Sequence, residues 1–169
     1  YEALEKAVSQ LSPAELVAGV MRLVDDYTSP KPLVHEIAGA CGYMGQELLN
    51  PPTVEGWHTG REWIDSGALV ERVNFAANQV GDLSKPGVQR IVARLTALGP
   101  TMTIEKLVDA CLELTGFVPV SQDRRAELIA HVAIGGEVRC GTLQELDTFN
   151  QRVARLLQLV VSSREYQFA

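Results

Sequence analysis

The sequence predicts an all-α fold, and two observations carry this prediction. Apolar residues recur at intervals of three and four along almost the whole chain, which is the spacing of one face of a helix. They alternate nowhere over a stretch long enough for a half-buried strand. We therefore expect one domain over residues 1–169, a compact bundle of about seven or eight helices with one long loop over residues 50–65.

The first predicted helix begins at Ser-Pro-Ala-Glu, residues 12–15. Ser12 caps free backbone N–H groups, proline suits the first helical position, and Glu15 completes a capping box. The apolar stripe of this helix then runs as far as Tyr27.

The second predicted helix spans residues 31–48 and carries glycine at positions 39, 42 and 45. Glycine costs a helix interior about 1 kcal/mol relative to alanine, so three of them require a reason. We expect them to allow close approach of a neighbouring backbone, and we expect this helix to be central.

The third predicted helix follows the loop, with Ser66 as its N-cap, and reaches about Val80 before Gly81 ends it. Four further amphipathic segments follow, separated by glycine and proline. Their ranges are 86–98, 103–115, 122–134 and 142–164.

Composition excludes two classes of partner. The net charge of −6 and the pI near 5.1 argue against nucleic-acid binding, which depends on a basic face that neutralises phosphates. No run approaches the roughly 18 apolar residues of a membrane span, so we expect none in this segment.

Local spacing offers no metal site and no nucleophile. His35-Glu36 begins like the zinc-protease pattern HExxH, but Gly39 stands where the second histidine would be. His58 and His131 stand alone in the sequence. We expect no metal and no cofactor.

Both tryptophans lie in one loop, NPPTVEGWHTGREWI, residues 50–64. Long loops in compact domains are disproportionately functional. Flat indoles beside hydrogen-bonding side chains are typical of sites that bind sugar rings. The alternative is a structural plug, in which both indoles fold back over the bundle and Arg61 pairs with Glu62 or Asp65. The candidate ligand-binding residues are Trp57, Trp63, Glu55, His58, Arg61 and Asp65.

The acids near this loop suggest a second hypothesis. Glycosidases work with paired carboxylates, and Glu55, Glu62 and Asp65 are gathered beside the candidate sugar platform. Arg72 and Asn74, on the following helix, are expected to tie the free carbonyls of the loop to the bundle.

Residues 44–76, MGQELLNPPTVEGWHTGREWIDSGALVERVNFA, resemble the signature of the bacterial family catalogued as domain of unknown function 1800. That signature has a Gly-Gln pair, a Pro-Pro turn, Gly-Trp, a second glycine, Trp-Ile, and a helix with Arg-x-Asn-Phe-Ala. The final LLQLVVSSREYQFA also resembles the C-terminal end of the family. The positions that match are Gly45, Gln46, Pro51, Pro52, Gly56, Trp57, Gly60, Trp63, Ile64, Arg72, Asn74, Phe75 and Ala76.

The resemblance implies more than the residues do by themselves. Proteins of the family are several hundred residues long, which implies that this chain is a C-terminal portion that contacts a missing N-terminal part. Export signals are common in the family, which implies an extracytoplasmic location, secreted or in the cell envelope. Its genes often lie beside those of another exported family, which implies a separate protein partner. We therefore expect a structural or interaction module of a surface or envelope assembly, making protein or glycan contacts. The alternative is an extracytoplasmic hydrolase that acts on polysaccharide with acids of the 50–65 loop.

Overall fold

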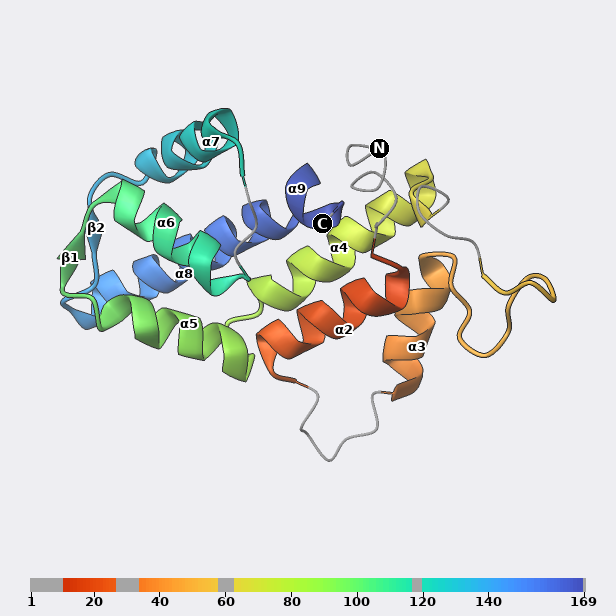
Figure 1. The fold of residues 1–169 in the computed structure, drawn as a ribbon. Helices are drawn as coiled ribbons and strands as arrows, with labels where there is room; N and C mark the ends of the chain where they lie inside the picture. The colour runs from red at the N-terminus through yellow and green to blue at the C-terminus, as the bar shows by residue number, and fades with distance from the viewer. Residues whose placement is uncertain (1–10, 27–33, 58–62, 117–119, 169) are drawn as a thin grey trace.

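The computed structural model describes residues 11–26, 34–57, 63–116 and 120–168. Within these residues the chain forms eight helices and one two-stranded sheet (Figure 1), so the predicted all-α bundle is confirmed. The helices are α2 (Pro13–Val24), α3 (Val34–Tyr43), α4 (Ser66–Gly81), α5 (Pro86–Thr96), α6 (Ile104–Leu114), α7 (Gln122–Ala133), α8 (Leu143–Val161) and α9 (Arg164–Gln167), and the strands are β1 (Thr101–Met102) and β2 (Val138–Arg139).

Side-chain caps set the start of two long helices. At α2, Ser12 Oγ accepts a hydrogen bond from Glu15 N at 3.3 Å, and Glu15 Oε2 accepts one from Ser12 N at 2.8 Å. This is the predicted capping box. Thr142 and Glu145 form the same reciprocal pair at the start of α8. Each cap satisfies backbone N–H groups that the first helical turn leaves free.

The core lies between α4 and α8, which pack along each other, with α2 on the other side of α4. Helices α5, α6 and α7 close the end of the bundle away from α3 (Figure 1). The side chains that fill this core are aliphatic and almost inaccessible to solvent. They include Leu16, Val20, Ala76, Val80, Leu95, Leu107, Val153, Leu156, Leu157 and Val160.

Helix α3 differs from its prediction. It ends at Tyr43 rather than at residue 48, and Cys41 is its only buried residue, so the prediction of a central helix is wrong. A Cβ built on Gly39 or Gly42 would meet nothing within 4 Å. These glycines therefore do not admit a neighbouring backbone, and α3 is a peripheral helix on α2 and α4.

The strands β1 and β2 were not predicted. They pair antiparallel, with Thr101 opposite Arg139 and Met102 opposite Val138. Each has two residues, which is too short for an alternating pattern to register in the sequence. The pairing ties the connection between α5 and α6 to the connection between α7 and α8.

All three cysteines are free and buried. Burial raises the pKa of the Cys111 thiol to about 12, so this side chain remains protonated at neutral pH. Cys111 therefore acts as a small apolar residue of the core.

Candidate functional site

The two tryptophans of the 50–65 loop have different environments. Trp63 is 5% exposed and belongs to the protein interior. Trp57 is half-buried, and its Nε1 is shielded from solvent without a hydrogen-bond partner. Three of the residues predicted here, His58, Gly60 and Arg61, lie outside the described residues. The indole of Trp63, one of the two in the candidate sugar platform, is therefore not accessible to solvent.

The acids of the loop do not form a pair where they are described. Glu55 is exposed at the end of a turn. Asp65 Oδ1 accepts a hydrogen bond from Ala68 N at 2.7 Å and so caps α4. The predicted cap, Ser66, is instead the first residue of that helix. Glu62 lies outside the described residues.

The loop turns sharply between Thr53 and Gly56. Gly56 N donates to Thr53 O at 3.1 Å, and Thr53 Oγ1 donates to Gly56 O at 3.3 Å. Gly56 has a φ of 106°, a conformation that favours glycine. Pro51 and Pro52 are exposed before the turn, and Asn74 is exposed on α4.

The Gly-Gln pair of the signature ends α3 and returns the chain to α2. Gln46 N donates to Cys41 O at 2.8 Å and Gly45 N donates to Gly42 O at 2.9 Å, which is a Schellman motif. Gly45 has the positive φ, 92°, that this motif requires. The turn places Gln46 Oε1 2.8 Å from Ala14 N, so Gln46 caps the first turn of α2 across space.

Replacing Gln46 with leucine is expected to lower the free energy of unfolding by about 1–2 kcal/mol, because the partly buried Ala14 N–H loses its acceptor. The control is Gln46→Glu, which keeps the oxygen and places a negative charge at a helix N-terminus, where it is favourable. Urea denaturation of both variants tests this. An equal loss in both would show that keeping the acceptor oxygen does not preserve stability, and the hydrogen bond to Ala14 N would not explain the loss.

Arg72 of the signature is fully buried in α4. Its Nη1 donates to Leu11 O at 2.9 Å and its Nη2 donates to Gln167 O at 3.0 Å. Gln167 is 1% exposed and donates from Nε2 to Val161 O at 2.7 Å. Burial lowers the pKa of the Arg72 guanidinium. Arg72 therefore joins the segment before α2 and the C-terminal helix α9 to α4, and the carbonyls it binds lie outside the 50–65 loop.

The difference between the tryptophans predicts a difference in fluorescence. In a Trp57→Phe variant, emission from Trp63 is expected to be blue-shifted and poorly quenched by acrylamide, because that indole is 5% exposed. In a Trp63→Phe variant, the half-buried Trp57 should be quenched more readily. Red-shifted, readily quenched emission from Trp63 would contradict its burial.

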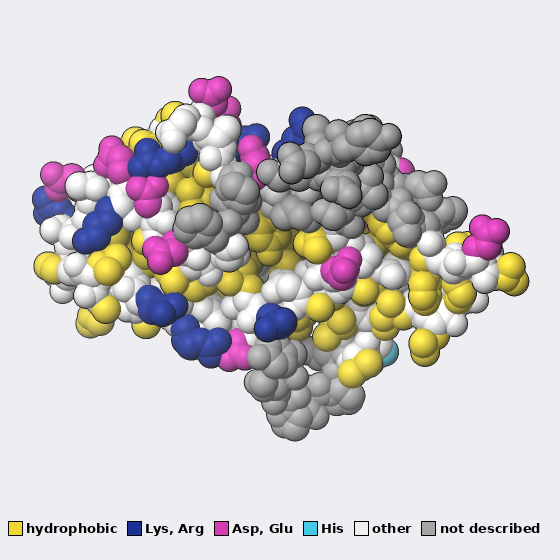
Figure 2. All heavy atoms as spheres, in the orientation of Figure 1, with side chains coloured by type: hydrophobic (Ala, Val, Ile, Leu, Met, Phe, Trp, Pro, Cys, Tyr) yellow, Lys and Arg dark blue, Asp and Glu magenta, His cyan; other side chains and the backbone are white. Residues whose placement is uncertain are grey.

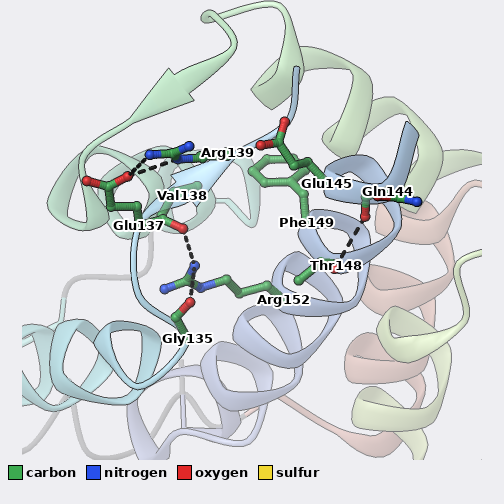
Figure 3. Close-up of a pocket in the computed structure, with 9 residues that line it drawn as sticks. All are labelled: Gly135, Glu137, Val138, Arg139, Gln144, Glu145, Thr148, Phe149 and Arg152. Atoms are coloured by element: carbon green, nitrogen blue, oxygen red, sulfur yellow. Dashed lines mark hydrogen bonds and ion pairs between the residues drawn. The ribbon is translucent and has the colours of Figure 1, made fainter. Parts of the chain in front are cut away.

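One pocket, of about 270 Å³, lies between β2 and α8 (Figure 3). The charged residues that line it already serve the local structure. Arg152 donates to the carbonyls of Glu137 at 3.0 Å and Gly135 at 3.4 Å, Arg139 pairs with the Glu137 carboxylate at 2.5 Å, and Glu145 caps α8. We assign no ligand to this pocket.

Two further pockets flank α3. The one between α2 and α3 has a volume of about 320 Å³ and is lined by Ala14, Val17, Ala18, Met21, Arg22, Ile37, Cys41 and Leu48. The other has a volume of about 500 Å³ and is lined by Ala38, Gly39, Gly42, Tyr43, Glu47 and Leu48. Leu48 lines both pockets.

Large hydrophobic side chains are exposed along α3 and the turns that follow it. Of the nine exposed in the described residues, five lie between residues 34 and 54. They are Val34 at 74%, Tyr43 at 79%, Leu48 at 38%, Leu49 at 95% and Val54 at 106%. We call these five side chains and the larger pocket the α3 surface. Figure 2 shows hydrophobic atoms gathered at this end of the molecule, on the right.

Sequence reasoning missed the α3 surface. The signal was present, because VHEIAGACGY is apolar on more than one side of the helix. The three glycines instead predicted a central helix. The two residues that separate the interpretations, Gly39 and Gly42, could be placed only from the structure.

The described residues contain no group of three or more histidine, cysteine, aspartate or glutamate side chains placed to hold a metal ion. None of their helices is long and apolar enough to cross a membrane. The fold and the site therefore define a helical domain whose most distinctive described feature is an apolar surface.

The profile of the family described as "Protein of unknown function (DUF1800)" matches residues 3–168. The chain belongs to this family. The match covers nearly the whole chain, including residues 82–141, and the expectation that the chain is a C-terminal portion is not borne out. No curated protein and no solved structure matches the chain.

Proposed function

We propose that this chain is an interaction domain without catalytic activity, and that it binds a protein partner through the α3 surface. One observation carries the proposal. Among the described helices of ten or more residues, α3 buries the fewest side chains, although its sequence is largely apolar. The loop that follows adds Leu49 and Val54, whose side chains are almost fully exposed to solvent.

An exposed surface of this kind favours binding. Burying apolar area releases about 25 cal/mol per Å², so each of these large side chains gains about 1.5–3 kcal/mol when a partner covers it. Contiguous apolar patches on folded domains commonly mark interaction sites. Tyr43 and Leu48 of the α3 surface line the larger pocket. The other exposed apolar residues, such as Ile134 and Leu143, lie in other parts of the chain.

A protein partner has more support than a glycan. A sugar platform needs accessible aromatic faces, and Trp63 is buried. The hydrolase hypothesis has less support still, because Asp65 is engaged as a helix cap and Glu55 lines none of the pockets described above. The place of this domain in an extracytoplasmic surface or envelope assembly rests on the family resemblance alone. Fractionation of cells that express the gene tests that location.

The binding surface is tested with paired variants. Leu49→Ser with Val54→Ser removes two of the most exposed side chains of the α3 surface, and Ile134→Ser with Leu143→Ser removes two of similar exposure elsewhere. Affinity capture followed by mass spectrometry should recover a partner with the wild-type protein and with the second pair, and lose it with the first. Circular dichroism checks that both pairs remain folded. Loss with both pairs, or with neither, argues against the α3 surface.

A further inference from the structure

The segment 34–57, which carries the α3 surface, has an unbalanced charge. The segment 34–57 contains three glutamates, Glu36, Glu47 and Glu55, one histidine, and no lysine or arginine. All three glutamates are exposed. Among the residues that line the two pockets beside α3, the only basic residue is Arg22. It lies on α2 and lines the smaller pocket. Lys31 and Arg61 belong to the neighbouring segments outside the described residues.

The segment 34–57 exposes both carboxylates and apolar side chains. The larger pocket has Tyr43 and Leu48 in its lining, and Glu47 is the only carboxylate there. Glu47 Oε2 accepts one hydrogen bond, from Asn50 Nδ2 at 2.9 Å, so it keeps capacity for another donor. Glu36, at the start of α3, has its carboxylate 4.0 Å from His35 Nε2 and is 64% exposed.

The pocket is open at the glycines. A Cβ on Gly39 or Gly42 would meet nothing within 4 Å, so an incoming side chain finds space directly above the backbone of α3. An apolar side chain there would contact Tyr43 and Leu48. A lysine or arginine adjacent to this apolar residue in the partner's sequence would then lie near Glu47.

The charge argues against three other occupants. A second copy of this chain, docked by the same surface, would bring Glu36, Glu47 and Glu55 of each copy toward one another without an opposing base in the segment. Nucleic acid and an anionic lipid surface would be repelled by the same carboxylates.

We propose that the α3 surface binds a protein segment in which apolar side chains are flanked by lysine or arginine. The inference rests on the proposed function, because it names the chemistry of the partner for the same surface. Apolar side chains of the segment enter the larger pocket, and its cations pair with Glu36, Glu47 and Glu55.

Synthetic peptides test this chemistry. Two helical peptides share one apolar face and differ only in their flanking residues, which are lysine in one and glutamate in the other. Calorimetric titration into the wild-type protein should show binding of the lysine peptide, at least tenfold tighter than the glutamate peptide, and weaker at higher salt. The triple variant Glu36→Gln, Glu47→Gln, Glu55→Gln should lose about tenfold in affinity for the lysine peptide. A matched triple, Glu105→Gln, Glu113→Gln, Glu127→Gln, replaces exposed glutamates elsewhere and should keep it.

The outcomes separate this inference from the proposed function. Equal affinity for both peptides, or no affinity for the lysine peptide at millimolar concentration, overturns the proposal of a basic partner. The capture experiment with Leu49 and Val54 variants can still succeed in that case. Sedimentation that shows a dimer lost on Leu49→Ser with Val54→Ser also overturns it, since the occupant would then be a second copy.

Discussion

Replacing Gly87 with alanine is expected to lower the free energy of unfolding by about 3 kcal/mol. Gly87 lies in the first turn of α5 and is buried against the end of α2. A Cβ there would lie 2.1 Å from Leu23 O and 2.6 Å from the carbonyl carbon of Val24. These are backbone atoms, which cannot rotate away as a side chain does, so the two helices must separate. For a chain of this size the melting temperature should fall by about 6–12 °C.

The contact that Gly87 allows is also held by charge. Lys85 Nζ lies 2.5 Å from Asp26 Oδ2, and Arg90 pairs with Asp25, so the first turns of α5 are bound to the end of α2. These pairs tie the two helices together at the place where the alanine would push them apart.

A second glycine provides the control. Gly19 is exposed within α2, and a Cβ there would meet nothing within 4 Å. Gly19→Ala should therefore raise the free energy of unfolding by about 0.5–1 kcal/mol, because alanine is the better helix former. Thermal and urea denaturation of both variants check the pair. If Gly87→Ala were as stable as Gly19→Ala, α5 would not approach α2 this closely.

The sequence was sufficient where structure is decided locally. The capping box of Ser12 and Glu15 predicted the start of α2, because both hydrogen bonds join residues three apart. Helical spacing likewise predicted α5 to α8 to within a few residues at each end. Asp65 was missed as the cap of α4 because Ser66 beside it is an equally good capping residue.

Glycine shows where local reasoning failed. Gly39, Gly42 and Gly87 are all helical, and spacing alone suggested close packing at the first two. The structure places the close approach at Gly87 and open space at the others. A glycine next to a backbone and a glycine next to solvent look the same in one sequence, because the neighbour comes from a distant part of the chain.

The environment of the two tryptophans could not be predicted for a related reason. Two tryptophans in one loop suggested a common platform, but Trp63 is buried while Trp57 is half-exposed. Burial depends on which elements the loop crosses, and sequence order does not give that. The roles of Gln46 and Arg72 could not be predicted for the same reason. Their hydrogen-bond partners, Ala14 and Gln167, are 32 and 95 residues away in the sequence.

Arg72→Ala is expected to lower the free energy of unfolding by about 4 kcal/mol. The guanidinium makes two charge-assisted hydrogen bonds to carbonyls, worth about 1.5–3 kcal/mol each, and the substitution leaves Leu11 O and Gln167 O without this donor. It also removes the side chain that joins α9 to α4. Hydrogen exchange of the α9 amides should therefore accelerate more than exchange in α6. Within the described residues, Arg72 forms no hydrogen bond with α6.

Two further variants keep the test of Arg72 interpretable. Arg72→Lys retains the charge, but one ammonium group does not reproduce the planar fork that reaches two carbonyls, so it should lose part of the stability and part of the α9 protection. Arg94→Ala removes an exposed arginine of α5 and should stay within about 0.5 kcal/mol of the wild type. If Arg72→Lys matched the wild type in both readouts, a single cation would suffice, and the two-carbonyl bridge would not explain why this arginine is buried. If Arg72→Ala lost stability without loosening α9, the arginine would serve packing in α4 rather than the attachment of the C-terminal helix.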